Sequence, residues 1–237
     1  MKIAKRWMPF VLVFFLAGCL YPEDRKNENR IPYKDQIQSV QTAVEDYQKD
    51  TMVLPIKNRD AGTDLFQKYP IDFNKLVPKY LQDVPGNSFE KGGTYQYVLI
   101  RAEDQPTVKL VDLVVTDNVQ DVQMALDSYI REHRYPPFTK VLAEGRYAFD
   151  HKKLGLKKKP TVTSPFTGRE LPLILDNNAK VMVDYKKDLA DAIRSNPKDA
   201  AAGEDIRYLL ADHSFFSPAH SVPYTAEDGK PVFLIKQ

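Results

Sequence analysis

Two stretches of the chain carry apolar residues at the spacing of an amphipathic helix. Apolar side chains fall at positions 37, 40, 44 and 47 in the first, and at 119, 122, 126 and 129 in the second. This 3-4-3 spacing places them in one stripe along each helix. Asp35 and Asp117 precede the two stretches, where a carboxylate can cap free backbone N–H groups. The pattern predicts two helices of the same design.

The two predicted helices belong to an internal duplication. Residues 37–47 (IQSVQTAVEDY) and 119–129 (VQDVQMALDSY) share Gln, Val, Gln, Ala and Tyr at corresponding places. After each helix comes a loop with proline, and then a related segment, 69–76 in the first copy and 147–154 in the second. A repeat of this kind predicts two structural modules rather than one continuous domain.

Both copies continue into residues that favour β-strands. These are 95–101 and 107–115 in the first copy, and 171–175 and 180–185 in the second, with the turn Asp176-Asn177-Asn178 between them. The predicted fold class is therefore α+β. It consists of tandem small modules, each an amphipathic helix packed on a short antiparallel hairpin or sheet.

The duplication divides the chain into parts. We expect a first α+β repeat over 36–116, a second over 117–186 and a C-terminal segment over 187–237. In the last segment, broken helical stretches precede a final predicted hairpin of 223–226 and 231–235. This order is that of a degraded third repeat.

The first 18 residues follow a different pattern. Three basic residues open it, Lys2, Lys5 and Arg6. An apolar run of about 14 residues follows, which is shorter than the roughly 20 that a membrane span needs. The run ends in the quartet Leu16, Ala17, Gly18 and Cys19. This order indicates a signal peptide, and the quartet resembles a bacterial lipobox.

The lipobox resemblance implies that cleavage leaves Cys19 as the first residue, carrying a covalent diacylglyceryl group. We expect residues 1–18 to be the lipoprotein signal peptide and 19–35 to be a polar tether. The expected location is the extracytoplasmic face of the cell membrane, with the membrane bound through the lipid anchor. Two or three acyl chains are sufficient for stable anchoring.

Composition narrows the possible functions. Cys19 is the only cysteine among the 237 residues, so an intramolecular disulfide and a Cys-rich metal site are excluded. Of the 34 basic residues, three belong to the predicted signal peptide, which leaves 31 against 32 acidic residues. This balance gives no support to nucleic-acid binding.

One cluster of like charges stands out, consisting of Lys152, Lys153, Lys157, Lys158 and Lys159. A solvated loop is the simpler interpretation. The alternative is contact with anionic lipid headgroups or wall polymers, since each lysine contributes about 1 kcal/mol near an anionic surface.

Catalytic and metal-binding patterns are weak. Ser195 and Lys198 match S-x-x-K, the nucleophile motif of penicillin-binding proteins, but Pro197 disfavours the helical turn that the motif needs. The histidines do not have metal-site spacing; they are His133, His151, His213 and His220. We expect no enzymatic activity, no metal and no cofactor other than the covalent lipid.

Two family resemblances add to this picture. Residues 77–97 (VPKYLQDVPGNSFEKGGTYQY) are similar to the soluble half of type II secretion pseudopilins, in which a helix packs on a small antiparallel sheet. The chain departs from them because it has no prepilin cleavage site. Residues 16–23 and 31–38 resemble the YphF-type lipoproteins of Bacillus and its relatives. That resemblance implies a Gram-positive cell envelope and nothing catalytic.

Two functional hypotheses remain. The leading one is a non-enzymatic protein-interaction module of the cell envelope with an envelope protein as partner. The alternative is a binding protein for a small ligand or cell-wall fragment in the cleft between the copies. A flat, mixed surface would favour the first, and a pocket with convergent polar groups between the modules would favour the second.

Overall fold

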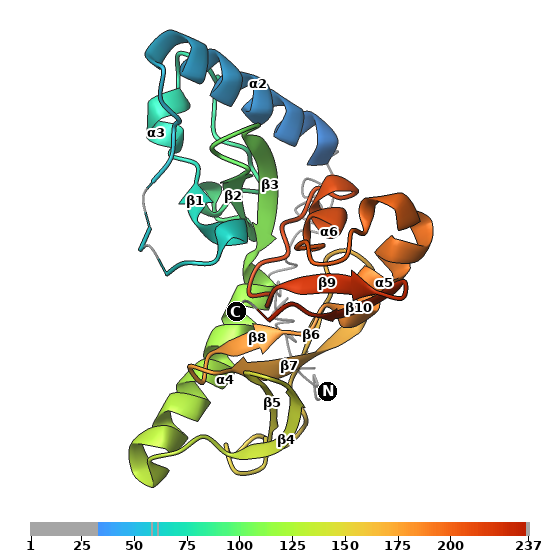
Figure 1. Ribbon diagram of the computed structural model, residues 1–237. Coiled ribbons are helices and arrows are strands. Elements are labelled where there is room, and N and C mark those ends of the chain that lie inside the picture. Colours follow the sequence, from blue (N-terminus) through green and yellow to red (C-terminus); the bar gives the residue numbers. More distant parts are fainter. Residues whose placement is uncertain (1–32, 58, 61, 236–237) are drawn as a thin grey trace, which may run out of the picture.

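The computed structural model describes residues 33–57, 59–60 and 62–235. Within them the chain is an α+β protein, as the sequence predicts. Figure 1 shows a first unit (residues 33–112) at the top, a second unit (113–185) at the bottom and a third unit (186–235) beside their junction.

The first unit is a helix packed on a three-stranded antiparallel sheet of order β1-β2-β3. The expected apolar stripe of α2 faces this sheet, because Ile37, Val40 and Val44 are buried in the same cluster as Leu99 and Leu110. The elements are α2 (Tyr33–Thr51), η1 (Leu65–Gln67), β1 (Tyr69–Pro70), α3 (Phe73–Leu76), η2 (Phe89–Lys91), β2 (Tyr95–Ile100) and β3 (Thr107–Asp112).

The second unit repeats this arrangement and adds strands to it. Tyr147 of β5 pairs with Leu175 of β7, just as Tyr69 of β1 pairs with Leu99 of β2, and β7 then pairs with β8 as β2 pairs with β3. The elements are α4 (Leu113–His133), β4 (Phe138–Ala143), β5 (Arg146–Phe149), β6 (Thr161–Thr163), β7 (Glu170–Asp176) and β8 (Val181–Val183).

The helix starts differ from the predicted ones. Asp35 lies inside the first turn of α2 rather than before it, and Asp117 lies within α4. Asp112 is the N-cap of α4, and its carboxylate accepts a hydrogen bond of 2.8 Å from the backbone N–H of Val114. The helix begins earlier because Val115 extends the buried stripe by one turn. The predicted strand 107–115 therefore ends at residue 112.

The third unit has the same order of helix, edge segment and hairpin. The backbone N–H of Ile206 donates to the carbonyl of Tyr224 at 2.9 Å, as that of Ile71 donates to Tyr97 in the first unit. The elements are α5 (Lys186–Ser195), η3 (Pro197–Asp199), α6 (Tyr208–Asp212), β9 (Tyr224–Glu227) and β10 (Lys230–Phe233).

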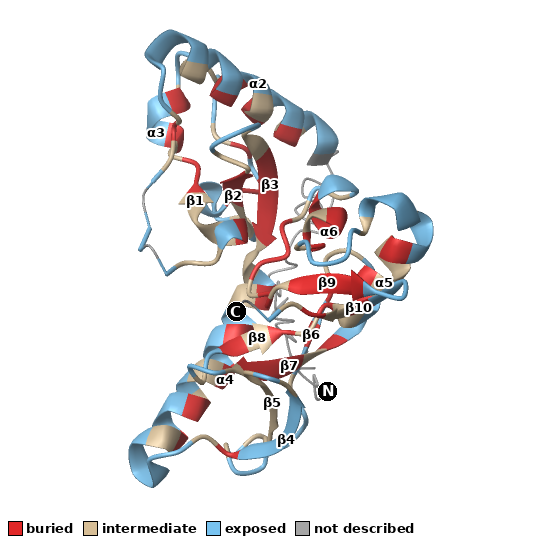
Figure 2. Ribbon diagram, in the orientation of Figure 1, coloured by how far each residue is buried: buried red, intermediate tan, exposed pale blue. Residues whose placement is uncertain are grey.

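The third unit also completes the other two. Its segment 215–221 forms parallel bridges from Phe216 to Leu110 of β3 and from Ser221 to Val183 of β8. The face of the first sheet that points away from α2 is covered as well, since Val98 and Val111 are buried against Ala219. Figure 2 shows β3 in red, whereas β4 at the lower end is pale blue.

Candidate functional site

The predicted lipidation site falls outside the described residues. This applies to Leu16, Ala17, Gly18 and Cys19, to the signal peptide and to most of the tether. Lipidation therefore stays a prediction. Among the residues that the structure describes, no helix has the length and apolar character of a membrane span.

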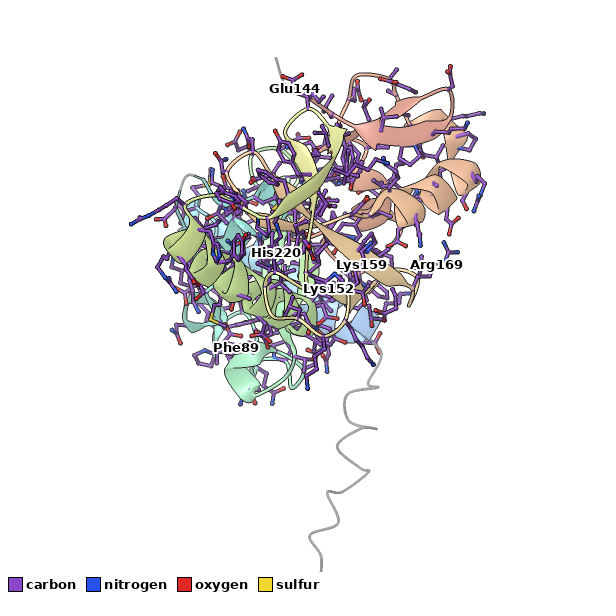
Figure 3. The ribbon with its side chains drawn as sticks, turned by 90° about the horizontal axis from the view of Figure 1, so that it is seen from below. Phe89, Glu144, Lys152, Lys159, Arg169 and His220 are labelled. Atoms are coloured by element: carbon purple, nitrogen blue, oxygen red, sulfur yellow. The ribbon has the colours of Figure 1, made fainter. Side chains whose placement is uncertain are left out.

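The five lysines of the cluster lie on one loop between β5 and β6, here called the lysine loop (residues 150–160). Leu154 and Leu156 hold this loop to the second unit, because both pack against its core. All five lysine side chains are exposed, and within the described residues none of them forms an ion pair. Figure 3 labels two of them, Lys152 and Lys159, in a view from below.

An exposed strand lies beside the lysine loop. β4 is the edge strand of its sheet, and it exposes 45% of Phe138 and 65% of Val141. A cavity of about 400 Å³ lies on this side, lined among others by Leu142 of β4 and Lys159 of the lysine loop. Cationic and apolar groups therefore meet at one cavity.

The cavity lies at a gap in the sheet. β5 pairs with residues 175–176 of β7, and β6 pairs with residues 170–172. Between them, Leu173 and Ile174 pair with neither strand, and both line the cavity. We call β4, β5 and the lysine loop together the basic hairpin face.

A second concentration of charge lies buried where the units meet. The Arg207 side chain is only 5% exposed and forms ion pairs with Asp64 of the first unit at 2.9 Å and with Asp205 at 2.7 Å. It also donates to the carbonyl of Ser221 at 3.0 Å and lies over the ring of Phe66. Because every charge has a partner, this cluster fastens the third unit to the first.

Two further contacts join the same units. Arg101 forms a bidentate ion pair with Asp212, at 2.6 and 2.8 Å. The ammonium group of Lys109 donates to the carbonyls of Ala211 and Ser214, and burial lowers the pKa of this lysine. None of these residues belongs to a recognisable motif in the sequence, although a lysine within the apolar strand 107–112 is an unusual feature.

The four histidines do not come together. His220 is half-buried, and its Nε2 lies 3.1 Å from Oγ1 of Thr116. Burial lowers the pKa of His220 to about 4, and the charges of Lys180 and Arg59 act in the same direction. His133 stacks on Tyr129 instead, so these rings are used in packing.

A groove runs between the first unit and α4. It has a volume of about 420 Å³ and is lined among others by Phe89, Gln96, Val114 and Gln120. Phe89 is 62% exposed at its rim; it is labelled in Figure 3, as is His220. We call this the junction groove.

The junction groove continues into a second cavity of about 370 Å³. The two share the lining residues Gln67 and Gln120, and the second adds Lys180 and His220. Polar groups from all three units thus converge there.

The arrangement offers little for catalysis or metal binding. Among the described residues, no group of three or more His, Cys, Asp or Glu side chains is placed to hold a metal ion. Ser195 is the last residue of α5, and Lys198 lies in η3 beyond Pro197. The S-x-x-K residues therefore do not share a helical turn.

Comparison with known proteins gives one match. Residues 33–112 match the YphF family N-terminal domain. This range begins with α2 and ends with β3, so the similarity covers the first unit. Neither a curated protein nor a solved structure gives a significant match to the chain. The resemblance to pseudopilins stays a prediction.

Proposed function

We propose that the chain is a YphF-like lipoprotein, anchored through Cys19 to the extracytoplasmic face of the cell membrane, and that it acts as a non-enzymatic protein-interaction module. A pocket between the modules was expected to favour ligand binding, but the junction groove instead supports the interaction role, because exposed apolar side chains line it. An exposed aromatic side chain, Phe89, and an exposed aliphatic one, Val114, line a groove built by two units.

The chemistry of the junction groove suits a polypeptide segment. Interfaces typically combine aromatic or aliphatic anchors with a polar rim. The amides of Gln96 and Gln120 can donate and accept hydrogen bonds, as a peptide backbone requires. Arg59 and Asp117 contribute one charge of each sign. The expected occupant is therefore a neutral segment with an apolar side chain.

The buried contacts between the units support this role because they hold both walls of the groove in place. Gln67 lies on the wall that the first unit contributes. Asp64, three residues before it, forms an ion pair with Arg207 of the third unit, which holds this wall in place. The other wall is α4. His220 of the third unit is hydrogen-bonded to Thr116 of this helix. A preformed groove loses less conformational entropy on binding.

The alternative function is the binding of a small ligand or a cell-wall fragment. The adjoining cavity favours it, because Gln120, Lys180 and His220 converge there. Concave sites with a few placed polar groups are typical of ligand binding.

In-cell photo-cross-linking tests the proposal. A photoreactive residue at position 89 is compared with one at position 52, because Met52 is also exposed but lies outside the groove. We expect one partner to be captured from position 89 only, and not when Cys19→Ala prevents anchoring. The mass of the N-terminal peptide reports lipidation directly.

Capture of the same abundant neighbours from positions 89 and 52 would contradict the interaction role. In that case, thermal-shift screening of wall fragments distinguishes the alternative. A fragment that stabilises the wild type but not Lys180→Ala would identify the adjoining cavity as a ligand site.

A further inference from the structure

The basic hairpin face is strongly cationic. Residues 138–160 contain seven lysine and arginine side chains and only two carboxylates, those of Glu144 and Asp150. The carboxylate of Asp150 accepts a hydrogen bond from the backbone N–H of Lys152 at the start of the lysine loop. Five exposed lysines outnumber this one carboxylate, so the loop presents a net positive charge to the solvent.

Exposed apolar side chains accompany this charge. Phe138 packs on Tyr147 with ring centroids 4.4 Å apart, yet it stays 45% exposed, and Val141 and Leu142 are exposed as well. In the described part of the first unit, β4 has no counterpart. The repeated fold therefore does not require this strand, and its apolar residues need another explanation.

We propose that the basic hairpin face docks on anionic phospholipid headgroups, so that the second unit makes a membrane contact of its own. This inference takes only one part of the proposed function as given, namely that the chain is located at a membrane. Lysines near an anionic surface attract it, and apolar side chains beside them can enter the boundary between headgroups and acyl chains.

The cavity beside β4 fits this role. Lys159 is on its wall and can pair with a phosphate, while Leu142 and Phe149 supply apolar surface. Asp150 and Asp184 also line the cavity, so the attraction to an anionic surface comes from the lysine loop as a whole rather than from the cavity wall. A lipid presents the same two chemistries within a short depth, a phosphate followed by hydrocarbon. The face therefore matches a headgroup in charge and in polarity.

An acidic peptide strand is the competing occupant, and the shape of β4 disfavours it. The pairing of β4 with β5 shifts register twice, between Phe138 and Lys140 and between Val141 and Ala143. Such irregularities make an edge strand a poor template for a further strand. A membrane surface needs no regular ladder of hydrogen bonds.

The test uses the mature chain, residues 19–237, with Cys19→Ser so that no acyl group contributes. The only tryptophan is Trp7, which lies in the predicted signal peptide, so Phe138→Trp gives the mature chain a single tryptophan, on β4. Met52→Trp is the matched control, since Met52 is exposed in the first unit. Binding is measured to vesicles of phosphatidylcholine with and without phosphatidylglycerol.

We expect the fluorescence of Phe138→Trp to shift to the blue with phosphatidylglycerol vesicles only, and that of Met52→Trp to stay unchanged. Raised salt should weaken the binding. Replacing the five lysines of the lysine loop by glutamine should weaken it by about 100-fold or more.

A matched charge control accompanies the five-lysine variant. It replaces five other exposed lysines that form no ion pair within the described residues, namely Lys34, Lys75, Lys187, Lys198 and Lys230. Both variants change the net charge equally. A difference in vesicle binding between them is therefore expected only if the lysine loop itself contacts the membrane.

Equal binding by the two five-lysine variants would overturn the proposal. So would binding of polyglutamate or of a soluble glycerol phosphate polymer without binding to vesicles, which would assign the face to a protein or a wall polymer. Because the assay contains no partner protein and no acyl group on the chain, its failure would leave the role of the junction groove unaffected.

Discussion

Gln41 and Gln123 make the same pair of hydrogen bonds in two different units. The side-chain oxygen of Gln41 accepts from the backbone N–H of Val108 at 2.8 Å, and that of Gln123 accepts from Val181 at 2.7 Å. The side-chain amide of Gln41 also donates to the carbonyl of Pro106 at 3.0 Å, and that of Gln123 donates to the carbonyl of Ala179 at 3.2 Å. In each unit this carbonyl lies two residues before the backbone N–H that the same glutamine accepts from. Both glutamines tie their helix to the last strand of the hairpin, which gives a structural basis for the sequence repeat.

This pairing predicts equal losses of stability. Gln41→Met and Gln123→Met should each lower the free energy of unfolding by about 1–2 kcal/mol, because a partly buried N–H loses its acceptor. Gln38→Met is the control, since Gln38 lies on the exposed side of α2. Urea unfolding measures the effect, and a loss at Gln41 no larger than at Gln38 would contradict it.

The buried ion pairs of Arg207 predict a larger effect. Arg207→Met leaves the carboxylates of Asp64 and Asp205 without their cation, which should cost about 3–5 kcal/mol. Arg101→Met breaks a more exposed pair with Asp212 and should cost about 1 kcal/mol. Thermal unfolding of both variants compares them, and similar losses would contradict the assigned role of Arg207.

His220 predicts a pH dependence of stability. Its pKa is about 4 in the folded chain and 6.5 when unperturbed. Between these values the unfolded chain binds the extra proton, so stability is lost as the pH falls from about 6.5 towards 4. By pH 4.5 the loss should reach about 2–3 kcal/mol.

The control for this titration is His220→Asn. His220 has a φ of 56°, and asparagine tolerates this left-handed conformation better than most residues. Unfolding free energies of both proteins at pH 7.5 and 4.5 give the comparison. If the unfolding free energy of the variant falls as much between pH 7.5 and 4.5 as that of the wild type, the pH dependence comes from a group other than His220 and the prediction is wrong.

The covered face of the first sheet predicts the behaviour of the first unit alone. A fragment of residues 33–116 would expose Val98, Ile100 and Val111, which the third unit covers in the full chain. We expect this fragment to bind a hydrophobic dye or to self-associate. Light scattering and dye fluorescence test this, and a monomeric fragment without dye binding would contradict it.

Much of the fold could be predicted from local patterns. The stripe of α2, the pairing of β2 with β3 and the final hairpin follow from periodicity and turn residues. The start of α4 could not be predicted, because Asp112 and Asp117 both precede apolar residues and either could cap the helix. Only the burial of Val115 shows that the helix starts after Asp112. β4 could not be predicted either, because its residues are almost all exposed and follow neither the helical period nor the alternation of a strand.

The candidate sites divide in the same way. The lysine cluster is a local feature of the sequence, and the structure places all five lysines on one exposed loop. The contacts of Asp64 with Arg207 and of Arg101 with Asp212 join residues more than 100 positions apart. The duplication predicts a cleft between the copies, but no local pattern records contacts over such a distance, so the residues that line the junction groove could not be predicted.

The bridges made by segment 215–221 have a consequence for the gene. Because this late segment completes the sheets of both earlier units, a premature stop codon shortly before it would remove the cover of a sheet encoded a hundred codons upstream. Newly made chains also present that uncovered sheet until residues 215–221 emerge. A nonsense mutation shortly before codon 215 should therefore be nearly as harmful as one early in the first unit.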